Sequence, residues 1–130
     1  MAKKQKASPV ELWKDEPDEH DFPAAADYLG LLFSDAASAS IVDALRASPP
    51  LRRKAKDLLR ASRQELLGED DPEVRKDLRR VAAGDRLSPV LLVRGRDGSP
   101  LLVADGYHRI CASYHLDEDA EIPCRLADTM

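Results

Sequence analysis

The sequence has little of several features that define large classes of protein. It contains two cysteines in 130 residues, and only 5% of its residues are aromatic. Two cysteines are too few for a disulfide framework, and a chain of this length buries enough apolar surface to fold without one. No run of about 18 apolar residues occurs, which excludes a membrane-spanning helix of the usual kind. The basic start, Met1 to Lys6, is not followed by an apolar segment and does not resemble a secretory signal. We therefore expect a cytoplasmic protein.

The charge balance is mildly acidic. Charged residues make up 34% of the chain and hydrophobic residues 43%, with a formal net charge of -4. The apolar fraction is close to that of ordinary globular domains, so we expect a folded chain. The negative charge argues against a protein that coats nucleic acid, which would be strongly basic. The composition predicts a flexible basic tail over residues 1–9 and a single domain over residues 10–130.

Helical patterns dominate the first two thirds of the chain. Trp13 is expected to anchor an irregular acidic segment, because Pro17 and Pro23 disfavour a continuous helix there. Apolar spacing, prolines and glycines then predict helices over about residues 23–33, 37–47, 51–67 and 72–83. Asp21 is the expected N-cap of the first of these helices.

The pattern changes to strands after Gly84. Two short apolar runs, residues 90–94 and 101–104, flank Asp97-Gly98, which is a typical hairpin sequence. A helix over about residues 107–116 and a strand over residues 121–126 follow, and Pro123 places that strand at an edge of the sheet. The predicted fold is α+β (mixed α/β), with a helical N-terminal half packed on a small mixed sheet.

The stretch from Asp105 to Arg109 has the composition of an anion site. An apolar strand passes through Gly106 directly into a helix, so the first-turn N–H groups of that helix are free to bind an anion. His108 and Arg109 add donors beside them. Asp105 is suited to hold a divalent ion or to cap the helix. Ordinary capping, with Arg109 paired to an acidic neighbour, explains the same residues.

The order of motifs over about residues 85–126 resembles the ParB/sulfiredoxin superfamily. The shared elements are Leu-Ser-Pro-Val-Leu-Leu-Val-Arg, a glycine-containing turn, Leu-Val-Ala-Asp-Gly-Tyr-His-Arg-Ile-Cys-Ala, and Ile-Pro-Cys-Arg. The loop is most similar to the Asp-Gly-His-His-Arg loop of the free-serine kinases, with Tyr107 in place of the first histidine. A group of uncharacterised bacterial ParB-like proteins shares the Asp-Gly-Tyr-His-Arg stretch.

This resemblance implies a nucleotide or phosphate bound by Gly106, Tyr107, His108 and Arg109. It also implies that Asp105 acts with Mg²⁺ bound through a phosphate of ATP, ADP or CTP. The predicted function is a nucleotide-binding domain, and as an enzyme it would transfer a phosphoryl group to a small-molecule acceptor, with Asp105 and His108 catalytic. The alternative is a non-catalytic regulatory or protein-interaction module.

Two activities of the superfamily are not expected. Sulfiredoxins have their reactive cysteine at the position of Tyr107, and a phenol cannot replace a thiolate of low pKa. ParB partition proteins continue into a helix-turn-helix domain, for which the chain has no room after the last predicted strand.

A phosphotransferase also needs a group that positions or deprotonates the nucleophile. The acidic segment before Phe22 offers Glu19 and His20 as catalytic candidates, followed by Asp21. The alternative is a solvated acidic loop whose Asp21 only caps the next helix.

The remaining clusters are less specific. On a helix over residues 51–67, a basic stripe would form from Arg52, Lys56, Arg60 and Arg63, with Lys56 the strongest candidate for a phosphate contact. Because the stripe has no interleaved aromatic residues, we expect a solvated face rather than a nucleic-acid site.

One helix face could also supply zinc ligands. His108, Cys111 and His115 share a face of the last helix, and Cys124 would complete a zinc set. Two buried thiols are the favoured alternative.

Overall fold

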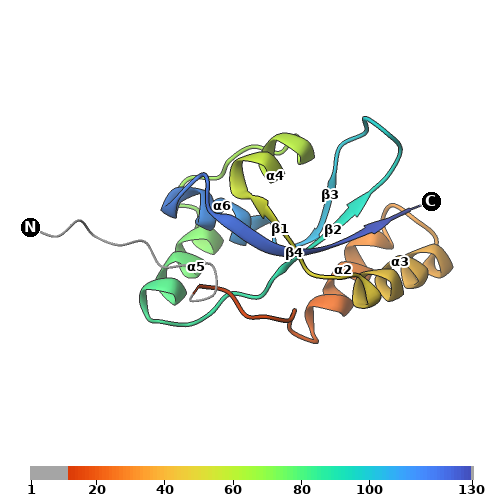
Figure 1. Ribbon diagram of the computed structural model, residues 1–130, viewed down its shortest axis with the longest axis horizontal. Helices are drawn as coiled ribbons and strands as arrows, with labels where there is room; N and C mark the ends of the chain where they lie inside the picture. Colours follow the sequence, from red (N-terminus) through yellow and green to blue (C-terminus); the bar gives the residue numbers. More distant parts are fainter. Residues whose placement is uncertain (1–11, 130) are drawn as a thin grey trace, which may run out of the picture.

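The computed structural model describes residues 12–129, so the predicted tail of residues 1–9 lies outside the described residues. The helices are α2 (Asp21–Leu29), α3 (Asp35–Ala47), α4 (Ala55–Ser62), α5 (Pro72–Ala82) and α6 (Tyr107–Leu116). The strands are β1 (Leu51–Lys54), β2 (Val90–Arg94), β3 (Leu102–Asp105) and β4 (Glu121–Asp128). The strands form one mixed sheet in the order β1-β4-β2-β3, so the predicted α+β class is confirmed (Figure 1).

The sheet is the middle layer, because both of its faces are buried. Val90 and Leu92 of β2 pack into a cluster with α4, α5 and α6. Leu91 and Val93, on the opposite face, pack into a second cluster with α2 and α3. Side chains alternate between the two faces of a strand, so a strand covered on both sides has a continuous apolar sequence. This explains the run Val90-Leu-Leu-Val.

The predicted helix over residues 51–67 is wrong at both ends. Leu51–Lys54 instead forms β1 and pairs antiparallel with β4, opposite Glu121 to Cys124. The helix α4 begins at Ala55 and ends before Arg63, which adopts a left-handed conformation with φ of 56°. Long-range strand pairing therefore overrides the local helical pattern. Arg52 lies on a strand, so the predicted basic stripe is not one helix face.

The predicted edge position of the last strand is also wrong. Strand β4 lies between β1 and β2, antiparallel to the first and parallel to the second. Pro123 is tolerated there because the pairing with β2 begins at Cys124, one residue later. The N–H that proline lacks is therefore not needed on that side.

Other predictions hold, with shifted ends. Trp13 is buried and bridges to Leu87, as expected of an anchor. Helix α2 ends at Leu29, four residues before the predicted end, although Phe33 still packs on the core. Asp21 is not the N-cap of α2, since His20 occupies that position. The hairpin β2–β3 and the helices α3, α5 and α6 lie within about two residues of their predicted bounds.

Among the described residues, no helix has the length and apolar character needed to cross a membrane.

Candidate functional site

The turn between β3 and α6 requires glycine. Gly106 is the N-cap of α6 and has a φ of 111°, a conformation that other residues rarely adopt. A Cβ atom at this position would lie 2.5 Å from Cγ1 of Val90. Gly106 therefore lets the loop cross closely over β2. Because it has no side chain, no side-chain cap bonds the first-turn N–H groups of α6.

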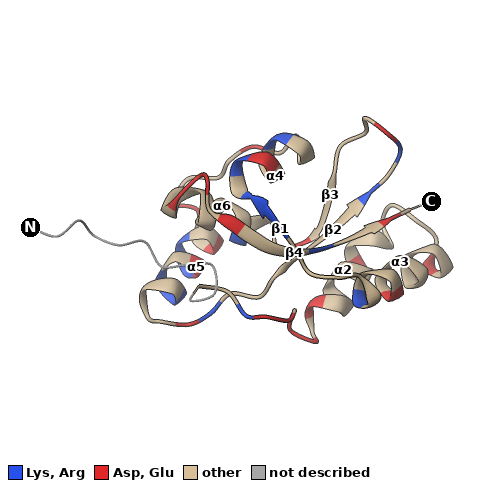
Figure 2. Cartoon of the chain, viewed as in Figure 1, with Lys and Arg blue, Asp and Glu red and all other residues tan. Residues whose placement is uncertain are grey.

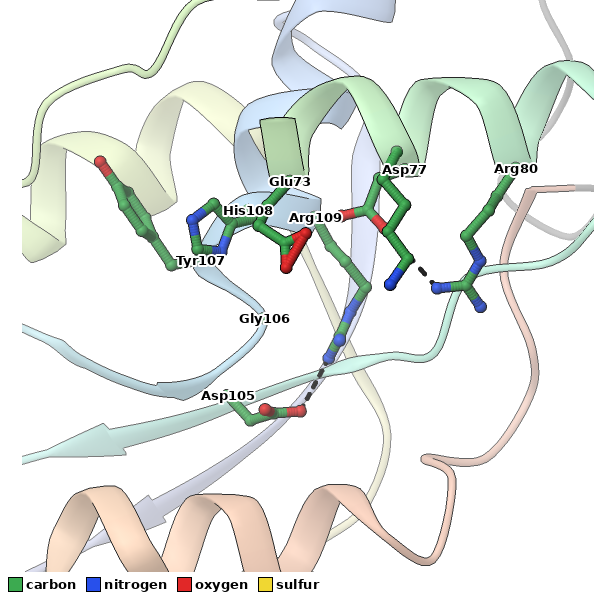
Figure 3. A pocket seen from close by; sticks show the side chains of 9 residues that line it. Glu73, Asp77, Arg80, Asp105, Gly106, Tyr107, His108 and Arg109 are labelled. Atoms are coloured by element: carbon green, nitrogen blue, oxygen red, sulfur yellow. Dashed lines mark hydrogen bonds and ion pairs between the residues drawn. The ribbon is translucent and has the colours of Figure 1, made fainter. Parts of the chain in front are cut away.

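Arg109 turns back from α6 toward the end of β3. Its Nη2 lies 3.0 Å from Oδ2 of Asp105 and donates to the carbonyl oxygen of Pro89 at 3.3 Å (Figure 3). The same nitrogen lies 3.8 Å from Oδ2 of Asp21, the first residue of α2. Only 15% of the Arg109 side chain is exposed. Its guanidinium therefore holds the loop together, as well as lining the site.

The buried Asp21 and the partly buried Asp105 form an acidic pair around this arginine. Burial raises the pKa of Asp105, Arg109 opposes that rise, and the neighbouring Asp21 adds to it. Ser88 Oγ donates a hydrogen bond to Asp21, and the backbone N–H of Asp18 donates to Ser88 Oγ at 2.9 Å. These bonds connect the acidic N-terminal segment to Ser88 ahead of β2, and the contact of Asp21 with Arg109 connects it to the loop.

A small polar cavity of about 200 Å³ opens where the loop faces α5. The loop provides residues 105–109, and α5 provides Glu73, Lys76, Asp77 and Arg80 (Figure 3). Lys76 and Arg80 are the cations on the α5 side, and His108 lies on the opposite side. In Figure 3, Arg109 points toward Asp105 while His108 remains near Glu73. His108 and Arg109, the two expected anion ligands, therefore line one cavity, but their side chains point in different directions.

Asp77 was not predicted from the sequence. It is 7% exposed, and burial raises its pKa, while the positive charges of Arg109, Arg80 and His108 act in the opposite direction. Arg80 Nη1 lies 3.6 Å from its Oδ1. The available signal was its position between Val74 and Val81 on the inward face of an amphipathic helix, where a carboxylate is out of place.

The acidic segment reaches the site through Asp21 alone of its three candidates. Glu19 is 78% exposed and its Oε1 pairs with Nη1 of Arg46 at 2.6 Å. His20 is 81% exposed, with Nε2 at 3.4 Å from Oδ1 of Asp21. Neither residue lines the cavity beside His108. The expectation that Glu19 or His20 contributes directly to the site is not supported by these positions.

Lys56 and Tyr107 also differ from their expected roles. Lys56 Nζ pairs with Oδ1 of Asp119 at 2.6 Å and does not line the cavity. Tyr107 lines the cavity, but its hydroxyl donates to the carbonyl oxygen of Glu65. The phenol therefore anchors the segment after α4, and Lys56 belongs to another surface.

The side chains that would bind Mg²⁺ or Zn²⁺ can be tested by the charge and burial of their donor atoms. The Arg109 guanidinium beside Asp105 places a positive charge against the oxygen that Mg²⁺ would need, so direct magnesium binding by Asp105 does not fit. The less favoured alternative, a zinc set of His108, Cys111, His115 and Cys124, does not fit either. The favoured interpretation of two buried thiols is confirmed. Cys111 and Cys124 are buried, and burial raises the pKa of Cys124 to about 11, whereas zinc binds the thiolate. Within residues 12–129, one group of three possible metal ligands has its ligand atoms within 4.8 Å of one another. It consists of Asp18, His20 and Asp21.

Comparisons with protein-family models, with curated proteins and with solved structures gave no match to this chain.

Proposed function

We propose that the cavity between α5 and the Asp105–Arg109 loop binds the phosphate end of a nucleotide or a related phosphorylated small molecule. The main support is the placement of Lys76, Arg80 and His108 around the uncapped start of α6. Free N–H groups at a helix start and nearby cations together favour an anion. The resemblance to the ParB/sulfiredoxin superfamily is a second support for phosphate binding. We also propose that the protein acts in the cytoplasm, where nucleotides are abundant.

The size of the cavity limits what enters it. Sites that enclose a whole drug-sized ligand are usually about 300–1,000 Å³, whereas this cavity is about 200 Å³. We infer that phosphate groups enter and that a base or sugar lies outside. Glu73 and Asp77 lower the net charge of the lining, so the ligand competes with resident carboxylates for Lys76 and Arg80.

A thermal-shift titration with ATP, ADP, CTP and pyrophosphate, each with and without magnesium, tests this binding. Ligand at about 100 times its Kd stabilises the folded state by about 2.7 kcal/mol, which raises Tm by several degrees. Lys76→Ala should remove most of the shift. Arg75→Ala, on the same helix but outside the cavity, is the matched control and should respond like wild type. If no phosphate compound raises Tm, or if Lys76→Ala responds fully, the proposal fails.

Phosphoryl transfer is the second candidate function, and Asp77 is the observation that favours it. A buried carboxyl with a raised pKa that faces a polar cavity is suited to take a proton from an attacking hydroxyl. Asp77→Asn should then abolish turnover of ATP with a small hydroxylated acceptor while the nucleotide-induced shift remains. A non-catalytic module would show the shift in both proteins and turnover in neither.

A further inference from the structure

A second and larger cavity lies between α4 and the β2–β3 hairpin, on the same face of the sheet as α4 and α6. It has a volume of about 660 Å³ and shares no lining residue with the cavity at the Asp105–Arg109 loop. One wall is α4 and the other is the β2–β3 hairpin, which extends beyond the helices (Figure 1). We call this feature the hairpin groove.

The floor of the hairpin groove is apolar. It consists of Leu58, Leu92, Leu101 and Leu126. Leu92 and Leu126 are direct neighbours in the parallel pairing of β2 with β4. Leu101 and Leu126 are only half-buried, so the floor offers apolar surface that the chain itself does not cover.

Arginines form the rim. The lining includes Arg53, Arg60, Arg63, Arg94 and Arg96, against Asp57 and Asp97 as its acidic members. Figure 2 shows blue segments on both α4 and the hairpin. Arg94 pairs with Asp128 at 2.7 Å, and Arg60 lies 3.9 Å from Asp57. Within residues 12–129, the ion pairs include no acidic partner for Arg53, Arg63 or Arg96. The groove lining thus has a net positive charge in a chain of net charge -4.

The two walls are held at a fixed spacing. Arg63 Nη2 donates to the carbonyl oxygen of Gly98 at 2.9 Å, and the N–H of Leu101 donates to the carbonyl oxygen of Ala61 at 2.9 Å. Arg63 makes its bond from a left-handed backbone conformation with φ of 56°, which is uncommon outside glycine. The groove therefore exists before any partner binds, which lowers the cost of binding.

We propose that the hairpin groove binds an acidic protein segment that has a leucine-like side chain between its carboxylates. Guanidinium groups pair with carboxylates in bidentate geometry, and an apolar side chain in a central pocket supplies much of the binding energy. Single-stranded nucleic acid is disfavoured, because the lining has no aromatic side chain on which bases could stack. Lys3, Lys4 and Lys6 near the start of this chain have the same charge as the rim, so their charge does not match that of the proposed occupant.

Fluorescence anisotropy with a labelled peptide of repeated Glu-Glu-Leu units tests this proposal. When the wild-type protein is titrated into the labelled peptide, the anisotropy should saturate with a Kd below about 1 mM. The double reversal Arg53→Glu and Arg96→Glu should weaken binding by about tenfold or more. Both arginines are exposed, so the fold should survive, which circular dichroism checks. Arg79→Glu, an exposed arginine outside the groove, is the matched control and should leave Kd unchanged.

A second peptide, with alanine in place of leucine, tests the proposal without any change to the protein. Repeated Glu-Glu-Ala units retain the charge but lack the apolar anchor, and they should bind about tenfold more weakly. The proposal is overturned by any of four results: no saturation with the wild type, equal binding of both peptides, an equal loss with Arg79→Glu, or tighter binding of oligothymidylate through the same arginines. It is also overturned if sedimentation shows self-association that the double reversal abolishes, because the occupant is then a second copy.

Discussion

Arg109 Nη2 lies 3.8 Å from Oδ2 of Asp21, although one residue begins α2 and the other lies in the last helix. The same nitrogen lies 3.0 Å from Asp105. Arg109 is therefore a structural centre of the candidate site as well as a cation in it. A loss of ligand binding in an Arg109 variant would not distinguish the two roles. For that reason Lys76, which projects from α5 with an exposed side chain, is the sharper probe of anion binding.

Arg109→Met should destabilise the protein by about 3 kcal/mol, because it leaves the buried Asp21 and the partly buried Asp105 without their cation. Urea unfolding at neutral pH measures this change. Arg79→Met, on the exposed face of α5, is the control and should alter stability by less than about 0.5 kcal/mol. Equal stability of Arg109→Met and wild type would show that the cluster does not hold the loop.

Gly106→Ala should cost about 3 kcal/mol or more, since the new Cβ would lie 2.5 Å from Val90 in a conformation with positive φ. Gly84→Ala separates the two causes. Gly84 also has a positive φ, of 87°, but a Cβ there meets nothing within 4 Å. Only the backbone strain remains, and we expect about 1 kcal/mol. Thermal or urea unfolding of both variants gives the comparison, and equal losses would contradict the close approach.

Asp21→Ala should destabilise the protein by about 2 kcal/mol, because the buried Ser88 hydroxyl loses its hydrogen-bond acceptor and Arg109 loses a nearby carboxylate. Glu19→Ala removes an exposed ion pair with Arg46 and should cost less than about 0.5 kcal/mol. Urea midpoints of the two variants test whether Asp21, rather than Glu19, connects the acidic segment to the site. The reverse order of losses would count against it.

The raised pKa of Asp77 predicts a pH dependence of stability. Its folded-state pKa lies above the ordinary value of 3.8, so the folded state holds the proton more tightly than the unfolded state does. Its contribution to stability is therefore greatest at acid pH and falls as pH rises from about 3.8 through the folded-state pKa. Relative to wild type, Asp77→Asn should thus be more stable at pH 7 than at pH 4.

Asp128 provides a control of opposite sign for this titration. A hydrogen bond from Arg94 lowers the pKa of Asp128, so its contribution is present at neutral pH and is lost as pH falls below 3.8. Urea unfolding of Asp77→Asn, Asp128→Asn and wild type at several pH values gives both differences. The same sign for the two variants would contradict the assigned shifts.

Local patterns predicted much of the fold. Helix α5 begins at Pro72, Asp97-Gly98 lies in the β2–β3 connection, and Gly106 joins β3 to α6, as the sequence indicated. Each depends on neighbours within a few residues. The position of β4 inside the sheet could not be predicted from Pro123. A proline shows that one backbone N–H donor is missing, but it does not show which strands lie on either side. Leu51–Lys54 likewise became a strand only because β4 was available to pair with it.

Spacing and backbone preference are local properties, so the helix and strand types of most segments and the strand-to-helix loop at Gly106 could be predicted from the residues alone. Long-range packing, by contrast, brings Asp21 within 3.8 Å of Arg109, puts Asp77 under the electrostatic influence of that arginine, and turns Arg109 toward Asp105. Those outcomes depend on how three segments distant in the chain pack on one sheet. Burial, and not residue type, then sets which carboxylates have raised pKa values and which side chains remain to meet a ligand.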